Sequence, residues 1–151
     1  MEPEKIYVVD TSVTAKLFVV ENYQEQAKQV YEQAIKKEIT LIAPELTCYE
    51  LNSFLTQANM SLDEIKEYLL FFDKQIQKGI ITIVPYSLEI QTKAAEIASI
   101  DTQGKGYISS LDATFHALAL IENAIFLTAD SKHYDKTKDL VGSILHLKNF
   151  K

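Results

Sequence analysis

The sequence predicts an α/β protein in which helices cover both faces of a central, mostly parallel β-sheet. Two observations support this prediction. Short apolar runs rich in Ile, Val, Leu and Phe recur along the chain, as expected for buried strands. Longer segments with apolar residues three and four positions apart lie between these runs, as expected for amphipathic helices. Strands that alternate with helices are typical of right-handed parallel β-α-β units.

The strands are predicted in five places along the chain. The first run, IYVV, ends at Asp10, and the second, TLIA, ends at Pro44. Three more runs, IITIV, AIFLT and SILHL, follow later in the sequence. All are too short for helices and have the β-branched and aromatic content of buried strands.

The helices are predicted between the strands, several of them with a recognisable start. One spans the segment from Tyr23 to Lys37, and another begins near Pro44. Ser61 begins a capping box, since Glu64 follows three residues later. The last two helices are predicted to begin at Ser87 and at Ser109 or Ser110.

The composition predicts one globular domain spanning residues 1–151. The chain has 151 residues, of which 47% are hydrophobic and 24% charged, as in ordinary globular proteins. No run reaches the ~18 apolar residues of a membrane span, and the first residues do not resemble a signal peptide. Cys48 is the single cysteine, so no internal disulfide can form. We therefore expect a cytoplasmic protein with no membrane association.

The charge balance disfavours several classes of function. The net charge is −6, and all 15 basic residues are lysine. Arginine makes the usual bidentate contacts with guanine and phosphate, so a sequence-specific DNA-binding module is disfavoured. The 4 glycines are too scattered for a phosphate-binding loop. An acidic enzyme of nucleic acids is still possible, because metal ions can bring positive charge to its site.

Four acidic residues occur where polar side chains are least expected. Asp10 ends the first strand, and Asp130 lies just after the AIFLT strand. Glu50 falls within an apolar helical stretch, and Asp112 lies near the start of an apolar helix. In open parallel sheets, ligands bind beyond the carboxyl ends of the strands. Carboxylates gathered there repel one another unless a cation such as Mg²⁺ or Mn²⁺ is bound.

Each acid also has a purely structural explanation. Asp10 could cap the helix that follows it, and Asp130 could be a turn residue or a cap. Asp112 could interact favourably with a helix dipole, and Glu50 could be a solvated helix residue. The case for a site therefore depends on all four occurring together in this order.

That order resembles the PIN-domain nucleases, most closely the VapC-type toxins of toxin–antitoxin pairs. The matching segments are VVDTSV, APELTCYELNSFL, SSLDATFHALAL and FLTAD, and together they extend over essentially the whole chain. The resemblance implies a PIN-like three-layer α/β/α sandwich with an acidic pocket that binds Mg²⁺ or Mn²⁺. It assigns Asp10 and Asp112 as direct metal ligands, with Glu50 and Asp130 acting directly or through water.

The resemblance also implies supporting residues and partners. Ser12 and Thr128 match positions that support the acids by hydrogen bonding. RNA is the implied substrate, a cognate antitoxin protein the implied partner, and a homodimer the implied assembly. The absence of arginine departs from the family pattern, so RNA binding would depend on lysines such as Lys16, Lys105 and Lys132. His116 is interpreted as a packed histidine, and Cys48 as a small buried residue.

The sequence therefore predicts a metal-dependent endoribonuclease, the toxin of a toxin–antitoxin pair, that hydrolyses RNA phosphodiester bonds through metal-activated water. Asp10, Glu50, Asp112 and Asp130 form its predicted catalytic set. Two other classes are alternatives. One is a PIN-like protein-binding module without cleavage. The other is a Mg²⁺-dependent phosphatase or receiver-type α/β domain, although Ser12 stands where such a phosphatase needs a second acid.

Overall fold

The computed structural model describes residues 3–151 and contains a five-stranded, fully parallel sheet with strand order β3-β2-β1-β4-β5. The α/β/α fold class predicted from the sequence is confirmed. The strands are β1 (Ile6–Val9), β2 (Thr40–Pro44), β3 (Ile81–Val84), β4 (Ile125–Thr128) and β5 (Ile144–His146). The helices are α1 (Thr11–Thr14), α2 (Gln24–Ile35), α3 (Leu46–Gln57), α4 (Leu62–Gln77), α5 (Leu88–Ala98), α6 (Ser110–Ile121) and α7 (Ser131–Thr137), with short 3₁₀ turns at Ala15–Leu17 and Leu147–Asn149.

Alternate residues of the central strands supply two separate cores. In β1, Tyr7 and Val9 pack into one core, whereas Val8 packs into the other. In β4, Leu127 packs into the same core as Tyr7 and Val9, and Phe126 packs into the same core as Val8. This is the two-residue periodicity of a strand that is buried on both faces, and it explains why the predicted runs are continuously apolar.

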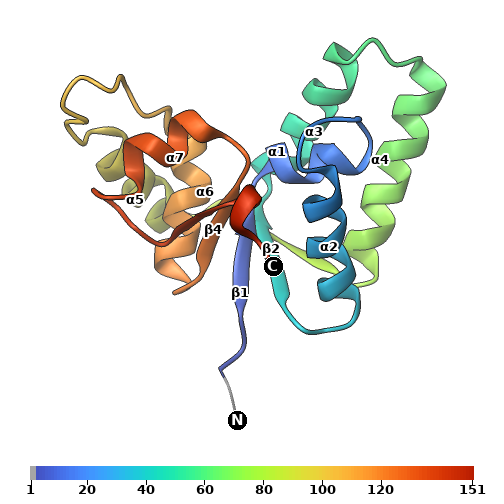
Figure 1. Ribbon diagram of the computed structural model, residues 1–151, viewed down its shortest axis with the longest axis horizontal. Coiled ribbons are helices and arrows are strands. Elements are labelled where there is room, and N and C mark those ends of the chain that lie inside the picture. The colour runs from blue at the N-terminus through green and yellow to red at the C-terminus, as the bar shows by residue number, and fades with distance from the viewer. Residues whose placement is uncertain (1–2) are drawn as a thin grey trace.

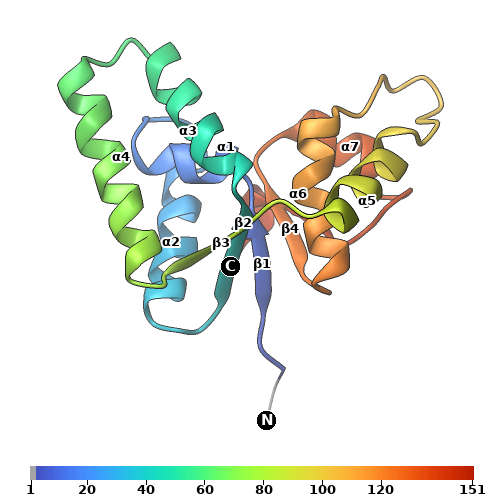
Figure 2. The same cartoon turned by 180° about the vertical axis from the view of Figure 1, so that it is seen from behind.

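Each core lies between one face of the sheet and the layer of helices that covers it. Helices α2, α3 and α4 cover one face, and α5 and α6 cover the other. Figures 1 and 2 show these layers as two wings on either side of β1 and β2, with α1 at the carboxyl end of β1. The carboxyl ends of β1, β2 and β4 lie at one edge of the sheet, since all the strands are parallel.

Serine side chains begin three helices, as the sequence predicts. Ser61 and Glu64 form both hydrogen bonds of a capping box at the start of α4. The Ser87 hydroxyl accepts from the amide of Ile90 at the start of α5, and Ser109 caps α6. These caps satisfy amides that have no partner within their helices.

The strand order bears on one alternative function. Receiver-type domains have the order 2-1-3-4-5, whereas this sheet has β1 in the centre, between β2 and β4. The receiver-type reading is therefore wrong in topology. Within the described residues, no helix has the length and apolar character needed to cross a membrane.

Candidate active site at the carboxyl edge of the sheet

Asp10 lies at the centre of the acidic site and is held by two hydroxyl groups. Its Oδ2 atom accepts hydrogen bonds from Ser12 Oγ at 2.8 Å and from Thr128 Oγ1 at 2.7 Å. The side chain is 8% exposed and forms no cap with the helix that begins after it. The helix-cap explanation of Asp10 is therefore wrong. Ser12 and Thr128 make the hydrogen bonds that the sequence resemblance implied.

Glu50 reaches the same edge from α3. Thr11 Oγ1 donates to its Oε1 atom at 3.0 Å and also lies 2.8 Å from Thr47 Oγ1. Burial, followed by repulsion from Asp10 and Asp112, raises the pKa of Glu50 to about 7, although the Thr11 hydrogen bond opposes this. A freely solvated helix residue would not have such a pKa.

Asp112 lies in the first turn of α6, which Ser109 caps. Burial, followed by repulsion from Asp10 and Asp130, raises the pKa of Asp112 to about 6, whereas Lys136 lowers it. A favourable interaction with the helix dipole would lower the pKa of this carboxyl. The net effect of the surroundings is thus to disfavour a negative charge at Asp112.

Asp130 is both a helix cap and a member of the acidic set. Its Oδ1 atom accepts from the amides of Lys132 and His133 at 2.9 and 3.2 Å, so the capping explanation is correct for this residue. Its own amide donates to Thr128 Oγ1 at 3.0 Å. Thr128 therefore bridges Asp130 and Asp10, because its hydroxyl donates to Asp10.

The four acids repel one another at this edge. Burial is the main cause that raises the pKa of Asp10, and the charge of Asp130 raises it further, against the hydrogen bonds from Thr128 and Ser12. The same kind of repulsion connects Asp10 with Glu50 and with Asp112. The structure therefore brings together all four acids that the sequence singled out.

The donor chemistry fits a hard divalent cation. Among residues 3–151, no three His, Cys, Asp or Glu side chains surround one point as a preformed ion site. Mg²⁺ commonly needs only one or two protein carboxylates, because water and substrate oxygens complete its shell. A cation near Asp10 and Asp112 would also offset the repulsion that raises their pKa values. The site thus fits Mg²⁺ or Mn²⁺ better than zinc, which prefers Cys and His.

The comparisons with known proteins agree with this geometry. Residues 7–139 match the family described as PIN domain, a range that includes all four acids. The chain belongs to the PIN domain family. The sequence resemblance to this family is confirmed. A comparison with curated proteins found no match.

Three solved structures share the fold of this PIN domain. VapBC2 from Rickettsia felis, bound to a DNA fragment from their promoter, has 16% identity and a TM-score of 0.68, covering 93% of this chain and 98% of that one. VapC20 from Mycobacterium tuberculosis, described as a sarcin-ricin loop cleaving toxin, has 16% identity and a TM-score of 0.61. The match covers 80% of this chain and 85% of that one. FitAcB from Neisseria gonorrhoeae has 14% identity and a TM-score of 0.64, and the match covers 95% of this chain and 99% of that one. At these identities the likeness establishes a shared fold.

The lysines of this PIN domain only partly fit the expectation from sequence. Lys16 is buried and its Nζ atom lies 2.9 Å from a carboxylate oxygen of Glu21. The expectation that Lys16 binds RNA is therefore not met. Lys105 and Lys132 are exposed and line one surface concavity. Lys136 and Lys138, which the sequence did not single out, line it as well.

Two further sequence interpretations concern His116 and Cys48. His116 is fully buried and hydrogen-bonded, as expected for a packed histidine. Cys48 is only half-buried against the core, so the expectation of a buried cysteine was too strong. Burial, followed by the charges of Asp73 and Glu45, raises the pKa of its thiol and makes it less reactive.

Sequence reasoning missed Thr11, which directly contacts Glu50. The only available signal was its position one residue after Asp10, at the end of a predicted strand. It also missed His133, which hydrogen-bonds to His116 across two helices. A pairing between residues 17 positions apart has no local sequence signal.

Proposed function

We propose that this PIN domain is a Mg²⁺- or Mn²⁺-dependent endoribonuclease that acts as the toxin of a toxin–antitoxin pair. The observation that carries the proposal is the buried Asp10 carboxylate, held by Ser12 and Thr128 among three further acids. Asp10 and Asp112 are proposed as the direct metal ligands, with Glu50 and Asp130 acting directly or through water.

The residues of the site would divide the chemistry as follows. A divalent cation held there by Asp10 and Asp112 would supply a water of lowered pKa and would offset charge on the phosphate oxygens. The hydroxyls of Ser12 and Thr128 fix the orientation of Asp10. Glu50 is proposed to accept a proton from that water, because the Thr11 hydroxyl holds its carboxylate at the same edge as Asp10. No cysteine or histidine nucleophile is required.

The lysine concavity supports a nucleic-acid backbone as substrate. It is lined by one acid, Asp135, and by four lysines, Lys105, Lys132, Lys136 and Lys138, in a protein whose net charge is −6. Lys132 follows Asp130 by two residues, and Lys136 acts electrostatically on Asp112. A strand whose scissile phosphate lies at the acids could therefore place neighbouring phosphates near these lysines.

Substitution of two exposed lysines tests this placement. The double variant Lys132→Gln, Lys138→Gln should raise KM for RNA and flatten the dependence of KM on salt, because fewer phosphate contacts release fewer counterions. The control Lys28→Gln, Lys93→Gln removes the same charge from α2 and α5. An equal effect of both pairs would show that only net charge matters.

The primary test of the proposed function is cleavage of mixed single-stranded RNA by purified protein. Wild type should cleave with Mn²⁺ and stop with a chelator, whereas Asp10→Asn should not cleave. Hydrolysis of an aryl phosphate is measured in parallel. Aryl-phosphate hydrolysis without RNA cleavage would favour the phosphatase alternative, and neither activity would favour a binding module.

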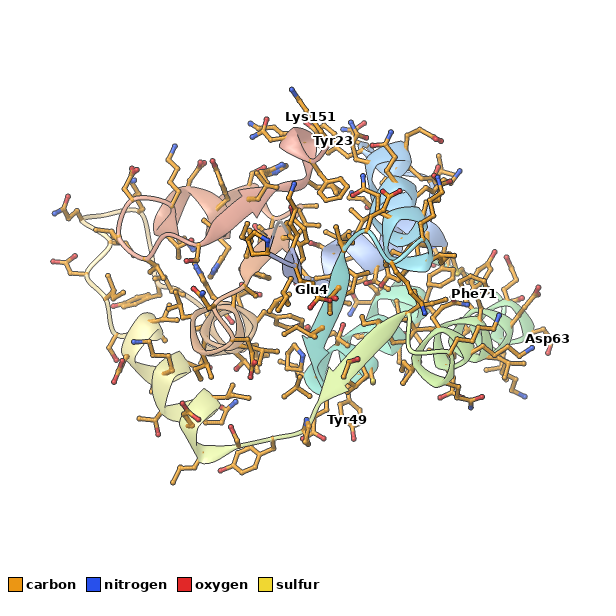
Figure 3. The ribbon with its side chains drawn as sticks, turned by 90° about the horizontal axis from the view of Figure 1, so that it is seen from below. Glu4, Tyr23, Tyr49, Asp63, Phe71 and Lys151 are labelled. Atoms are coloured by element: carbon orange, nitrogen blue, oxygen red, sulfur yellow. The ribbon has the colours of Figure 1, made fainter. Side chains whose placement is uncertain are left out.

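An antitoxin partner is proposed on a second surface, an apolar groove between α2 and α4. The groove has a volume of about 530 Å³ and includes Ile35, Leu70 and Phe71, which are 57%, 55% and 46% exposed. Figure 3 labels Phe71 on α4. Tyr49 of α3, which belongs to a different surface, is labelled well away from it. We propose that an apolar antitoxin segment binds here. Leu70→Glu should then abolish co-purification with the product of the neighbouring open reading frame.

A homodimer is proposed through the surface shared by α3, α5 and α6. Tyr49, Tyr86 and Leu111 line one concavity of this surface and are between 54% and 72% exposed. Apolar exposure of this kind often marks an interface. Tyr86→Glu should convert a dimer to a monomer in light scattering. We further propose the cytoplasm as the compartment, since the RNA substrate is found there.

A further inference from the structure

Two buried histidines connect the helices that carry Asp112 and Asp130. His116 lies one helical turn after Asp112 on α6 and is fully buried. His133 lies in the first turn of α7, three residues after Asp130, and is 3% exposed. Their Nδ1 and Nε2 atoms, respectively, are 3.0 Å apart. Neither histidine belongs to the acidic set described above.

The contacts of the pair determine which atoms carry protons. His116 Nε2 lies 2.7 Å from the carbonyl oxygen of Gly142. Because a carbonyl only accepts, His116 Nε2 carries a proton. The Nδ1 atom of the neutral ring is then an acceptor, so His133 Nε2 donates to it. Burial lowers the pKa of both rings, which is consistent with two neutral histidines.

The His116 contacts connect α6 to the start of α7 and, through Gly142, to the segment that follows α7. His116 contacts His133 near the start of α7 and Gly142 shortly after its end. Helix α7 has only 7 residues. A helix this short has little stability of its own, so tertiary contacts must set its position. Both rings also pack against Phe126 of β4, with centroid separations of 5.3 and 5.5 Å.

The position of α7 in turn sets the position of the Asp130 carboxylate. The amide of His133 donates to Asp130 Oδ1 at 3.2 Å, and the amide of Lys132 donates to the same atom. A movement of His133 would therefore carry Asp130 with it. A directional hydrogen bond specifies a separation between two helices, whereas an apolar contact of equal area allows them to slide.

We propose that His116 and His133 are positioning residues that set the separation between the carboxylates of Asp112 and Asp130. They touch neither substrate nor metal, and they act by holding α7 against α6. The inference depends on the proposed function, because that separation matters for a bound cation. Residues that orient metal-binding side chains typically change metal affinity 10–100-fold when they are replaced.

The test compares two substitutions of similar shape that differ in hydrogen bonding. His133→Gln retains an N–H donor for His116, whereas His133→Met has none. Leu118→Ala serves as the control for lost stability, since Leu118 is fully buried on α6 and outside the histidine contact. The affinity for Mn²⁺ is measured by calorimetry at a temperature where each protein is folded. Amide exchange at Lys132 and His133 reports on the Asp130 cap.

The expected results are specific to the hydrogen bond. His133→Met should weaken Mn²⁺ binding about tenfold or more and accelerate exchange of the two amides. His133→Gln should bind Mn²⁺ within about threefold of wild type, and Leu118→Ala should retain wild-type affinity despite its lower stability. Wild-type affinity in His133→Met, or an equal loss in Leu118→Ala, would overturn the inference.

Two further outcomes keep the test decisive. If His133→Met does not fold, His133→Gln decides alone, and a loss of affinity beyond about tenfold in that variant overturns the inference. If wild type itself binds no Mn²⁺, the proposed function fails first and the inference fails with it. Binding by wild type together with unchanged binding by His133→Met overturns only the inference.

Discussion

Replacement of Asp112 by Asn separates a metal-binding carboxylate from a structural one. Asn has nearly the same shape as Asp and removes one negative charge from the acidic site. The pKa of Asp112 is raised from 3.8 to about 6, chiefly by burial and then by Asp10 and Asp130. One pKa unit is worth about 1.4 kcal/mol, so the surroundings disfavour the ionised form of Asp112 by at most about 3 kcal/mol.

Solvent reduces that cost, because Asp112 is only half-buried. We therefore expect Asp112→Asn to stabilise the metal-free protein by about 1 kcal/mol at pH 8. The sign follows from proton binding. Between pH 4 and 6 the folded wild type holds a proton at Asp112 that the unfolded chain has lost, so wild-type stability falls as pH rises through this range. The advantage of Asp112→Asn should thus disappear near pH 4.

The assay is urea unfolding of metal-free protein at pH 4, 6 and 8, together with RNA cleavage at pH 8. Asp139→Asn, which removes an exposed carboxylate outside the acidic site, is the matched control and should show neither effect. RNA cleavage by Asp112→Asn should fall by orders of magnitude. If Asp112→Asn is less stable than wild type at pH 8 and still cleaves RNA, the reasoning is refuted.

Three other expectations follow from the same site. A concentration of Mn²⁺ 100 times its dissociation constant should stabilise wild type by about 2.7 kcal/mol and raise Tm by about 5–10 °C, and an unchanged Tm would argue against a cation site. Thr128→Val removes the donor at 2.7 Å from the buried Asp10 and should cost about 2 kcal/mol in urea unfolding, whereas a cost near zero would show that Asp10 needs no such support. Cys48→Ala should change stability by less than about 1 kcal/mol and leave RNA cleavage unchanged; loss of cleavage would reveal a role for the thiol.

The sequence predicts elements where local chemistry determines them. The strands of the sheet are short apolar runs, and the starts of α4, α5 and α6 have serine caps that satisfy local amides. Helix α7 was not predicted from the sequence, because SKHYDKT has no apolar periodicity. Its position depends on His116, which lies on another helix.

The acids of the site could be found for a different reason. A carboxylate at the end of an apolar strand or within an apolar helix is a local anomaly, so Asp10 and Glu50 stand out in the sequence. Which lysines face the substrate depends instead on tertiary pairing. In the fold, Lys16 forms a salt bridge with Glu21, whereas the charge of Lys136 on α7 acts on Asp112. Exposure likewise follows from the tertiary structure, since Tyr49 lies on α3 among apolar residues yet is 72% exposed.

The most direct test of the account is the chemistry of the RNA ends left by cleavage. Attack by water needs no 2′-hydroxyl group, so wild type with Mn²⁺ should also cleave an RNA that has a 2′-deoxy residue at the scissile position. The products should have no 2′,3′-cyclic phosphate, and a chelator or Asp10→Asn should abolish cleavage of both substrates. Cyclic-phosphate ends, or cleavage that survives the chelator, would contradict a metal-dependent hydrolysis centred on Asp10.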